Sequence, residues 1–571
     1  MKVLTWFRQF KNRIAQQGVS NNQLIVMTCL YLALICNIPF LHLTFNAVVA
    51  LPEYSLGFLA SVPVLLFCLM VIINSVLGMS FLLKPILVIS VVMSSLLFYA
   101  TFTYGIVFDK NMIQNGLETD LAEALTYFNA YALAFIFVAG ILPAYLIVKV
   151  KLIKQVPVRE FFSRAKLVAL HSILIGLIAA VYFANYAAVG RNNDHLLSYI
   201  TPYKFVDASI HYADRHYFSP PLPFTLLDTM PFIQSASNTP KVTVLVIGET
   251  ARAQSFSLNG YAQKTNQYTE QYGVVSFSNM WSCGTATAVS LPCMFSRLDR
   301  NNYDNRHANA QQNLLDLASI AGMDVLWIDN NNGSCKGVCA RVNAIDISTD
   351  PANPLCDGEY CLDEALLAPL QDKLEHLSAK NTLIVLHMMG SHGPTYYKRY
   401  PSDKRHFLPD CQRSDIQHCS QQAVINTYDN TIAYTDFVLS EIITRLDELS
   451  SNKQFETAML YVSDHGESLG EKGVYLHGLP YAFAPEEQTH VPMLFWQPDV
   501  ANIQTSNCYQ SASKEAISHD NLFDIVLGIT SISSDQYQLQ RDKLAPCRQG
   551  DEALASMSPI NAAIGSIDAG N

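Results

Sequence analysis

The chain has 571 residues, of which 50% are hydrophobic and 15% are charged, and its formal net charge is −11 at pH 7. This acidic balance excludes a nucleic-acid partner, because binding to phosphates requires a concentrated basic surface. The length allows several domains, and nearly all long apolar runs lie before residue 190. The composition therefore predicts a membrane-embedded part followed by a water-soluble part.

Five stretches before residue 190 are apolar over the roughly 20 residues that a bilayer-spanning helix needs. Runs such as PVLLFCLMVII are apolar on every helical face, which suits lipid better than the surface of a soluble bundle. The first stretch is too long and starts too late to be a simple signal peptide. The predicted spans are residues 24–46, 56–79, 82–104, 127–148 and 167–189.

Basic residues predict the orientation of these spans. Lys2, Arg8, Lys11 and Arg13 precede the first span, and a basic loop lies between the fourth and fifth. Because lysine and arginine concentrate in cytoplasmic loops, the N-terminus is predicted to be cytoplasmic. An odd number of spans then places everything after residue 190 outside the cytoplasm.

The cysteines give an independent prediction of the compartment. Three lie in the predicted spans, and the other ten, an even number, lie after residue 280 in sequence-local pairs. Disulfides persist in oxidising compartments such as the periplasm. Zinc ligation is the less favoured alternative, because the C-x₃-C and C-x₄-C pairs lack a partner pair with zinc-ribbon spacing. The ten are Cys283, Cys293, Cys335, Cys339, Cys356, Cys361, Cys411, Cys419, Cys508 and Cys547.

The remaining chain divides into three predicted segments after the transmembrane domain, 1–189. Residues 190–240 are rich in aromatic residues and contain SPPLP, which predicts short interfacial helices and a stiff linker, with an ordinary structured loop as the alternative. Residues 241–550 alternate short β-rich runs with helical ones, which predicts an α/β domain with a mainly parallel sheet. Residues 551–571 read as a flexible tail.

Polar residues follow the apolar strands of this predicted domain. KVTVLVIGET ends near Glu249, and TAMLYVSDHGESLG contains Asp464 and His465. Ligand sites of open α/β sheets lie at the carboxyl ends of the strands. Two carboxylates and an imidazole suit zinc, although a single acid at a strand end is more often a helix cap. His392 and His477 follow the same edge and are candidates for phosphate binding, proton donation or a second metal.

The stretch SCGTATAVSLPC, residues 282–293, supplies candidate nucleophiles between two cysteines. A hydroxyl at the open position of a catalytic zinc has a lowered pKa and becomes a nucleophile near neutral pH. The residues themselves leave open which of the hydroxyls does this. The candidates are Ser282, Thr285, Thr287 and Ser290.

Four ordered motifs resemble the phosphoethanolamine–lipid A transferase family, which includes the mobile colistin-resistance enzymes. They are GETARAQSFSLNGY (248–261), CGTATAVSLPCMFS (283–296), LHMMGSHGPTYYKRY (386–400) and YVSDHGESLGEKGVYLHG (461–478). The resemblance extends over nearly the whole chain. It implies a five-helix transmembrane domain followed by a C-terminal α/β domain of the alkaline phosphatase/sulfatase superfamily.

The resemblance also implies an activity and its partners. Phosphoethanolamine passes from phosphatidylethanolamine to a threonine and then to a lipid A phosphate, with zinc as the cofactor. This transfer lowers the negative charge of the outer membrane and gives polymyxin resistance. We expect a monomer in the bacterial inner membrane with its catalytic domain in the periplasm. Kdo, heptose or a glycan of teichoic-acid type remains an alternative acceptor.

By motif position, the resemblance assigns roles to individual residues. Thr287, four residues after Cys283, becomes the nucleophile in preference to Thr285. His392 and His477 take positions associated with phosphoethanolamine or further zinc. The other three hydroxyl residues of the loop are expected to make local hydrogen bonds. The implied zinc ligands are Glu249, Thr287, Asp464 and His465.

The resemblance also implies contacts to the lipid head group. The outward loop contains NGLETDLAE, and on a helix its polar residues would share one face, although a polar surface stripe explains them equally well. Lys336 matches the lysine of the family's S-x-x-K element, whereas Gly333 stands at the serine position with Ser334 displaced by one. The loop residues are Asn115, Thr119 and Glu123.

Local pairing of the outward cysteines follows from the same reading. The first pair would enclose Thr287, and closing such a loop stabilises a fold by about 2–3 kcal/mol. The expected pairs are Cys283–Cys293, Cys335–Cys339, Cys356–Cys361, Cys411–Cys419 and Cys508–Cys547.

Other functions share parts of this pattern. A glycerophosphate transferase of lipoteichoic-acid type or a sulfatase-like hydrolase would have the same fold and metal site. Sulfatases place a C-x-P-x-R or S-x-P-x-R motif at the nucleophile, and this loop reads C-G-T-A-T. A non-catalytic receptor or scaffold is disfavoured because every implied zinc ligand is present.

Overall fold

The computed structural model divides the chain into two compact units. One comprises Met1–Ile113 and Phe128–Phe218, and the other comprises Gln114–Tyr127 and Ser219–Asn571. The predicted tail, 551–571, lies outside the described residues. The structure describes residues 18–49, 55–78, 81–118, 121–234, 239–331, 333–350, 352–452, 454–498 and 503–548.

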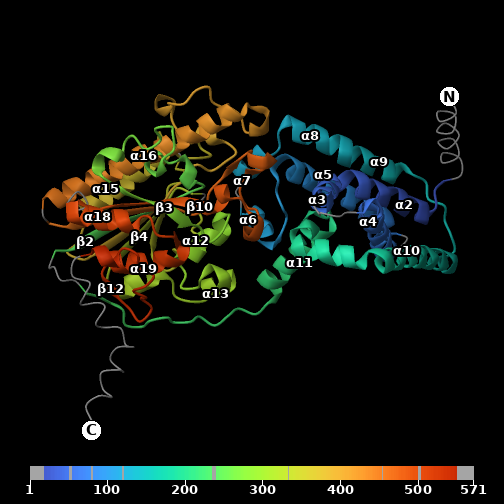
Figure 1. The fold of residues 1–571 in the computed structure, drawn as a ribbon, viewed down its shortest axis with the longest axis horizontal. Helices are drawn as coiled ribbons and strands as arrows, with labels where there is room; N and C mark the ends of the chain where they lie inside the picture. Colours follow the sequence, from blue (N-terminus) through green and yellow to red (C-terminus); the bar gives the residue numbers. More distant parts are fainter. Residues whose placement is uncertain are drawn as a thin grey trace, which may run out of the picture. The chain divides into compact units, whose positions relative to one another are not determined.

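The first unit is helical (Figure 1). Among the described residues, four helical segments are long and apolar enough to cross a membrane, namely Leu56–Leu77, Leu83–Tyr104, Ala130–Lys149 and Pro157–Phe183. A fifth span results if the bent pair Asn21–Cys36 and Ile38–Val49 counts as one. The helices are α2 (Asn21–Tyr31), α3 (Ile38–Val49), α4 (Leu56–Leu77), α5 (Leu83–Tyr104), α8 (Ala130–Ile136), α9 (Leu142–Lys149), α10 (Pro157–Asn192) and α11 (Tyr203–Ala213).

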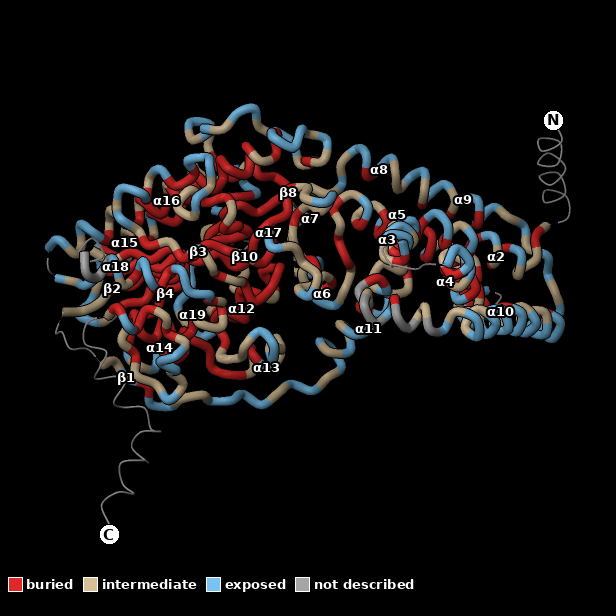
Figure 2. The backbone as a smooth tube through the Cα atoms, in the orientation of Figure 1, coloured by how far each residue is buried: buried red, intermediate tan, exposed pale blue. Residues whose placement is uncertain are grey.

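Much of the apolar surface of these helices is exposed. Figure 2 shows long exposed stretches on α9 and α10, and only 11% of the apolar window in Pro157–Phe183 is buried. Water would penalise such a surface, whereas lipid does not. The exposure therefore fits helices that face a bilayer.

The bend between α2 and α3 has a local cause. A π-helical turn, Leu32–Cys36, ends α2, and Pro39 lacks the N–H that a continuing helix needs. The amide of Asn37 lies at the bend, where it donates to the carbonyls of Leu32 and Thr201, both at 2.9 Å. Its oxygen accepts the backbone N–H of Thr201, also at 2.9 Å. The break is thus hydrogen-bonded to the predicted connector, which contains α11.

The second unit is built on an eight-stranded sheet with the order β11-β3-β10-β7-β2-β6-β4-β5. The strands β7, β2, β6, β4 and β5 pair in parallel, and β10 runs antiparallel to both of its neighbours. The predicted α/β class is therefore confirmed, with a mixed sheet. The strands are β2 (Lys241–Gly248), β3 (Val275–Trp281), β4 (Asp324–Asp329), β5 (Asn343–Asp346), β6 (Thr382–His387), β7 (Glu456–Ser463), β10 (His490–Trp496) and β11 (Ile517–Ser518).

Helices cover both faces of this sheet, with α15 and α16 on one side and α12 and α19 on the other (Figure 1). Leu245 and Ile247 of β2 share a buried core with Leu291 of α12 and Phe523 of α19. Figure 2 shows the sheet buried along its centre. The helices are α6 (Lys110–Glu118), α7 (Leu121–Thr126), α12 (Thr287–Phe295), α13 (Asn305–Asn309), α14 (Leu314–Ile320), α15 (Leu367–Glu375), α16 (Gln421–Ser451), α17 (Glu486–Thr489), α18 (Ile503–Ala512) and α19 (His519–Ile529).

Two small sheets and five disulfides complete the unit. β1 (Phe232–Ile233) pairs with β12 (Ile532–Ser533), and β8 (Ser468–Leu469) pairs with β9 (Tyr475–Leu476). The disulfides join the cysteines in the expected pairs, so zinc ligation by these cysteines is excluded. The pairs are Cys283–Cys293, Cys335–Cys339, Cys356–Cys361, Cys411–Cys419 and Cys508–Cys547.

Candidate active site

The predicted metal ligands meet at the carboxyl end of the two central strands. Glu249 follows β2, and Asp464 and His465 follow the adjacent strand β7. One ligand atom from each of the three lies within 4.8 Å of the others, and all three side chains are buried. The parallel register of β2 and β7 brings these residues together, because Gly248 pairs with Ser463.

The backbone turns sharply at this edge. Thr250 has φ of 60°, a left-handed conformation that is uncommon for a β-branched residue. Its N–H donates to Asp464 Oδ1 at 3.2 Å, and its hydroxyl donates to Glu249 Oε1 at 2.6 Å. The strained turn is thus held by the two carboxylates, as is common for strained residues at functional sites.

Thr287 places its hydroxyl directly on this cluster. It is the first residue of α12, and its Oγ1 lies 3.0 Å from Glu249 Oε2 and 3.4 Å from His465 Nε2. The Oγ1 of Thr285 instead donates to the carbonyl of Leu479 at 2.6 Å. The structure therefore brings Thr287, rather than Thr285, to the carboxylates.

The loop that carries Thr287 is anchored on several sides. Besides the Cys283–Cys293 disulfide, the backbone N–H of Cys283 donates to His519 Nδ1 at 3.0 Å. The hydroxyl of Ser282 donates to the Gly284 carbonyl at 2.6 Å, and that of Ser290 donates to the Asp464 carbonyl. These hydroxyls make local hydrogen bonds, whereas that of Thr287 faces the cluster.

The electrostatics of the cluster are unusual for a protein interior. Asp464 Oδ2 is buried without a hydrogen-bond partner, and His465 Nε2 lies 3.5 Å from it and 3.3 Å from Glu249 Oε1. Burial and the charge of Glu249 raise the pKa of Asp464 to about 7. Although burial alone would lower it, the pKa of His465 is raised to about 10 by the charges of Asp464 and Glu249.

These features fit a bound cation. Buried charges are costly unless they are paired or coordinate a metal. Two carboxylates, an imidazole and a hydroxyl form a donor set that suits zinc, and the unpartnered Oδ2 of Asp464 supplies one ligand atom. The residues present therefore fit a metal centre.

His477 and His392 lie beside the cluster. The ring of His477 has its centroid 4.5 Å from that of His465 and 5.6 Å from that of His392. His477 Nδ1 lies 2.9 Å from Glu467 Oε2, and the hydroxyl of Tyr396 donates to Glu467 Oε1 at 2.6 Å. Burial and the charge of His465 lower the pKa of His477 to about 3, so its ring is neutral in this arrangement.

Two polar residues of the site escaped the sequence prediction. Glu467 lies within the quoted SDHGES motif and is fully buried. Asn331 follows β4, and its side-chain amide donates to Glu249 Oε2 at 2.7 Å. Glu467 could have been found, because it is a second acid in the motif that contains Asp464 and His465. Asn331 is one of three consecutive asparagines, and nothing in the sequence distinguishes it from the other two.

Lys336 pairs with an acid that the sequence did not single out. Its Nζ lies 3.3 Å from Glu118 Oε2. Gly333 has φ of 61°, and a Cβ there would lie 2.3 Å from Asp346 Oδ2. The departure from the serine of the family pattern therefore has a local reason. The hydroxyl oxygen of Ser334 instead accepts the N–H of Lys336 at 3.4 Å.

Two of the predicted head-group residues of the outward loop belong to short helices. Asn115 belongs to α6 and the backbone of Glu123 to α7. Thr119 falls between these helices, outside the described residues. Their contact with a lipid head group stays a prediction.

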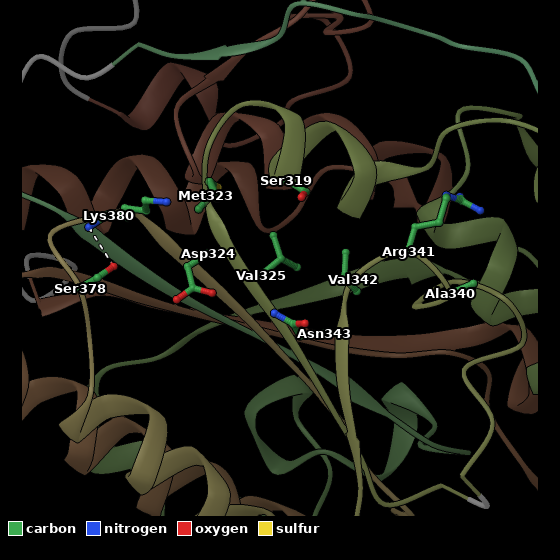
Figure 3. Close-up of a pocket in the computed structure, with 10 residues that line it drawn as sticks. All are labelled: Ser319, Met323, Asp324, Val325, Ala340, Arg341, Val342, Asn343, Ser378 and Lys380. Atoms are coloured by element: carbon green, nitrogen blue, oxygen red, sulfur yellow. Dashed lines mark hydrogen bonds between the residues drawn. The ribbon is translucent and has the colours of Figure 1, made fainter.

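A separate surface pocket of about 760 Å³ lies at the opposite end of the sheet (Figure 3). Asp324 and Asn343, which line it, are the first residues of β4 and β5. The candidate metal ligands follow the carboxyl ends of their strands, so this pocket is not part of their site.

Comparison with known proteins agrees with this geometry. The family described as Phosphoethanolamine transferase EptA/EptB matches residues 66–217, and the family Sulfatase matches residues 241–532. Phosphoethanolamine transferase EptA of Escherichia coli K12 is 36% identical over 536 residues, which cover 92% of this chain and 97% of that protein. Phosphatidylethanolamine transferase Mcr-1 of Escherichia coli is 36% identical over 494 residues, 84% of this chain and 90% of that protein.

A solved structure is similar over the same extent. It is the integral membrane lipooligosaccharide phosphoethanolamine transferase A of Neisseria meningitidis, with a TM-score of 0.86 and 36% identity, covering 92% of this chain and 98% of that one. Helical segments able to span a membrane and a sulfatase-type domain thus define a membrane-bound enzyme. The chain belongs to the phosphoethanolamine transferase family of the EptA and Mcr type.

Proposed function

We propose that this protein transfers phosphoethanolamine from phosphatidylethanolamine to a phosphate of lipid A, through Thr287 and with zinc as cofactor. The observation that carries the proposal is the position of the Thr287 hydroxyl, 3.0 Å from Glu249 Oε2 in a buried cluster of metal-ligand type. The names of the relatives, a phosphatidylethanolamine transferase and a lipooligosaccharide phosphoethanolamine transferase, support the donor and the class of acceptor.

Zinc would be held by the side chains of Glu249, Asp464 and His465 together with Thr287. When bound, the ion lowers the pKa of the threonine hydroxyl and polarises the phosphoryl group. The protein supplies the fixed geometry, because the disulfide and the hydrogen bond from Cys283 to His519 hold the loop. A nucleophile held in this way needs little reorganisation before it attacks.

The reaction then proceeds in two displacements. In the first, Thr287 Oγ1 attacks the donor phosphorus, the bond to the diacylglycerol oxygen breaks, and diacylglycerol leaves as the alcohol with the proton. In the second, an oxygen of the lipid A phosphate attacks the phosphorus of the phosphothreonine, the bond between that phosphorus and Thr287 Oγ1 breaks, and the threonine takes up the proton that the lipid A phosphate loses. We place His392 and His477 beside the phosphoryl oxygens, with Glu467 orienting His477 through the 2.9 Å contact.

The remaining predictions complete this proposal. The transmembrane domain, 1–189, anchors a monomer in the inner membrane. Residues 190–240 lie at the membrane interface and connect this domain to the catalytic domain, 241–550, which acts in the periplasm. The head-group contacts are Asn115, Thr119, Glu123, Lys336, His392 and His477. Added ethanolamine offsets the negative charge of lipid A, so cationic polymyxins bind less well.

Mass spectrometry of lipid A tests the proposal. Cells that produce the protein should carry phosphoethanolamine on lipid A, and cells that produce Thr287→Ala at the same level should not. Modification by Thr287→Ala would contradict the role of Thr287. Phosphoethanolamine on Kdo, heptose or another glycan in place of lipid A would contradict the acceptor and leave the chemistry intact.

A further inference from the structure

Asn331 is buried between Glu249, a candidate metal ligand, and the backbone of Met388, the residue that follows β6. Its Nδ2 lies 2.7 Å from Glu249 Oε2 and 3.0 Å from the carbonyl oxygen of Met388, and the residue is 4% exposed. Both partners only accept hydrogen bonds, so the atom between them must be the amide nitrogen. The orientation of the amide is therefore determined by its surroundings.

Asn331 is in turn fixed by a buried polar chain on the neighbouring strands. Its backbone N–H donates to Asp329 Oδ1 at 2.8 Å. The other oxygen of that carboxylate accepts the indole N–H of Trp327 at 2.8 Å and lies 3.0 Å from His387 Nδ1. Trp327 belongs to the central core, which leaves this chain little freedom to move.

The two oxygens of Glu249 are thereby distinguished. Oε1 accepts the hydroxyl of Thr250 at 2.6 Å, and Oε2 accepts the amide of Asn331 at 2.7 Å. These donors lie on two different loops and hold the plane of the carboxylate against rotation. The hydroxyl of Thr287 approaches Oε2 at 3.0 Å, so the orientation that Asn331 enforces also sets where the nucleophile meets the carboxylate.

We propose that Asn331 is a positioning residue of the metal centre, whose amide fixes the Glu249 carboxylate for zinc and for the Thr287 hydroxyl. The inference rests on the proposed function, because it takes zinc as the ion that Glu249 holds. Hydrogen bonds from outside the ligand set orient metal ligands, and their loss typically costs 10–100-fold in metal affinity or activity.

The adjacent residue offers a matched control. Asn330 is buried like Asn331, and its Nδ2 also makes two hydrogen bonds, to the Cys361 carbonyl at 3.0 Å and to Asp363 Oδ1 at 2.8 Å. Neither partner is a candidate metal ligand. Asn330→Leu and Asn331→Leu therefore remove the same number of buried hydrogen bonds of similar length from the same loop.

The test measures the zinc dissociation constant of the full-length protein in detergent, by competition with a fluorescent zinc chelator. Asn331→Leu is expected to weaken zinc binding by about 10–100-fold. Asn330→Leu is expected to lower the melting temperature of the metal-free protein to a similar extent while zinc binds nearly as in wild type. Should Asn331→Leu not fold, Asn331→Ala removes the same donor without adding a charge and is expected to weaken zinc binding to a similar extent.

Three results would overturn the inference. If the folded Asn331 variant binds zinc as tightly as wild type, the Asn331 amide is not needed to orient the Glu249 carboxylate. Equal weakening by Asn330→Leu and Asn331→Leu would assign the loss to the loop as a whole. Failure of the wild-type protein to bind zinc would overturn both this inference and the metal centre of the proposed function. The first two results would overturn the inference about Asn331 and leave the proposed function intact.

Discussion

Two buried aspartates of the α/β unit, Asp436 and Asp464, differ in how many hydrogen bonds their carboxylate oxygens accept. Asp436 accepts the amide of Asn266 at 3.2 Å, the backbone N–H groups of Tyr268 at 2.7 Å and Thr269 at 3.2 Å, and the Thr269 hydroxyl. Asp464 accepts two backbone N–H groups at Oδ1, and its Oδ2 has no hydrogen-bond partner. The oxygens of Asp436 are surrounded by donors, whereas Asp464 keeps one oxygen open, as its proposed role as a metal ligand requires.

The largest effect is expected from Asp464→Asn. The substitution removes a ligand charge, so zinc affinity should fall by more than about 100-fold, beyond the usual cost of an outer hydrogen bond. The melting temperature of the metal-free protein should stay the same or rise, because burial and the charge of Glu249 raise the pKa of Asp464 to about 7 and its charged form therefore costs stability at neutral pH. Chelator competition and thermal unfolding of the full chain measure the two quantities. A clear loss of metal-free stability would place Asp464 with the structural carboxylates.

The opposite pattern is expected from Asp436→Asn. An amide cannot accept all of the hydrogen bonds that reach Asp436, and an unsatisfied buried donor costs roughly 1–3 kcal/mol. The melting temperature should therefore fall, while the zinc dissociation constant of the folded protein stays close to that of wild type. Weakened zinc binding at retained stability would show that the two aspartates do not differ in the way described.

A smaller, pH-dependent effect is expected from His519. Its Nδ1 accepts the N–H of Cys283, and burial together with the charge of His465 lowers the pKa of His519 to about 4. The pKa is about 6.5 in the unfolded chain, so the stability from neutral His519 is present above pH 6.5 and is lost as the pH falls toward 4. Near pH 5.5 the loss is on the order of 1 kcal/mol.

His519→Gln tests this titration, because glutamine can accept one hydrogen bond and donate the other without taking up a proton. Melting temperatures of both proteins would be measured between pH 7 and about pH 4.5. Wild type should lose more stability on acidification than the variant. Parallel curves would show that His519 does not contribute to the acid sensitivity.

The local signals in the sequence predicted most of the fold and the three residues that meet in the candidate metal cluster. Length and apolarity predict helices that could span a membrane. An apolar strand followed by a carboxylate predicts that Glu249 and Asp464 meet at one edge, because the register of parallel strands aligns such ends. The resemblance was needed to choose Thr287 from four hydroxyl residues. The structure then shows a physical difference, since Thr285 bonds to the Leu479 carbonyl and Thr287 faces Glu249.

Residues whose roles depend on distant partners could not be predicted in this way. Asn330 and Asn331 are equivalent in the sequence, yet one bonds to Asp363 and the other to Glu249. Likewise, the pairing of Glu118 with Lys336 joins segments more than 200 residues apart, as their numbers show. The antiparallel direction of β10 also escaped prediction, because a buried strand has the same apolar pattern in either direction.

The most direct test of the central claim is to find the covalent intermediate. The purified full-length protein would be incubated with phosphatidylethanolamine in the absence of acceptor, digested, and analysed by mass spectrometry. The account predicts phosphoethanolamine on the hydroxyl of Thr287, and its loss when lipid A is added. Phosphoethanolamine on a different side chain, or transfer to lipid A by a protein that never carries the adduct, would contradict it.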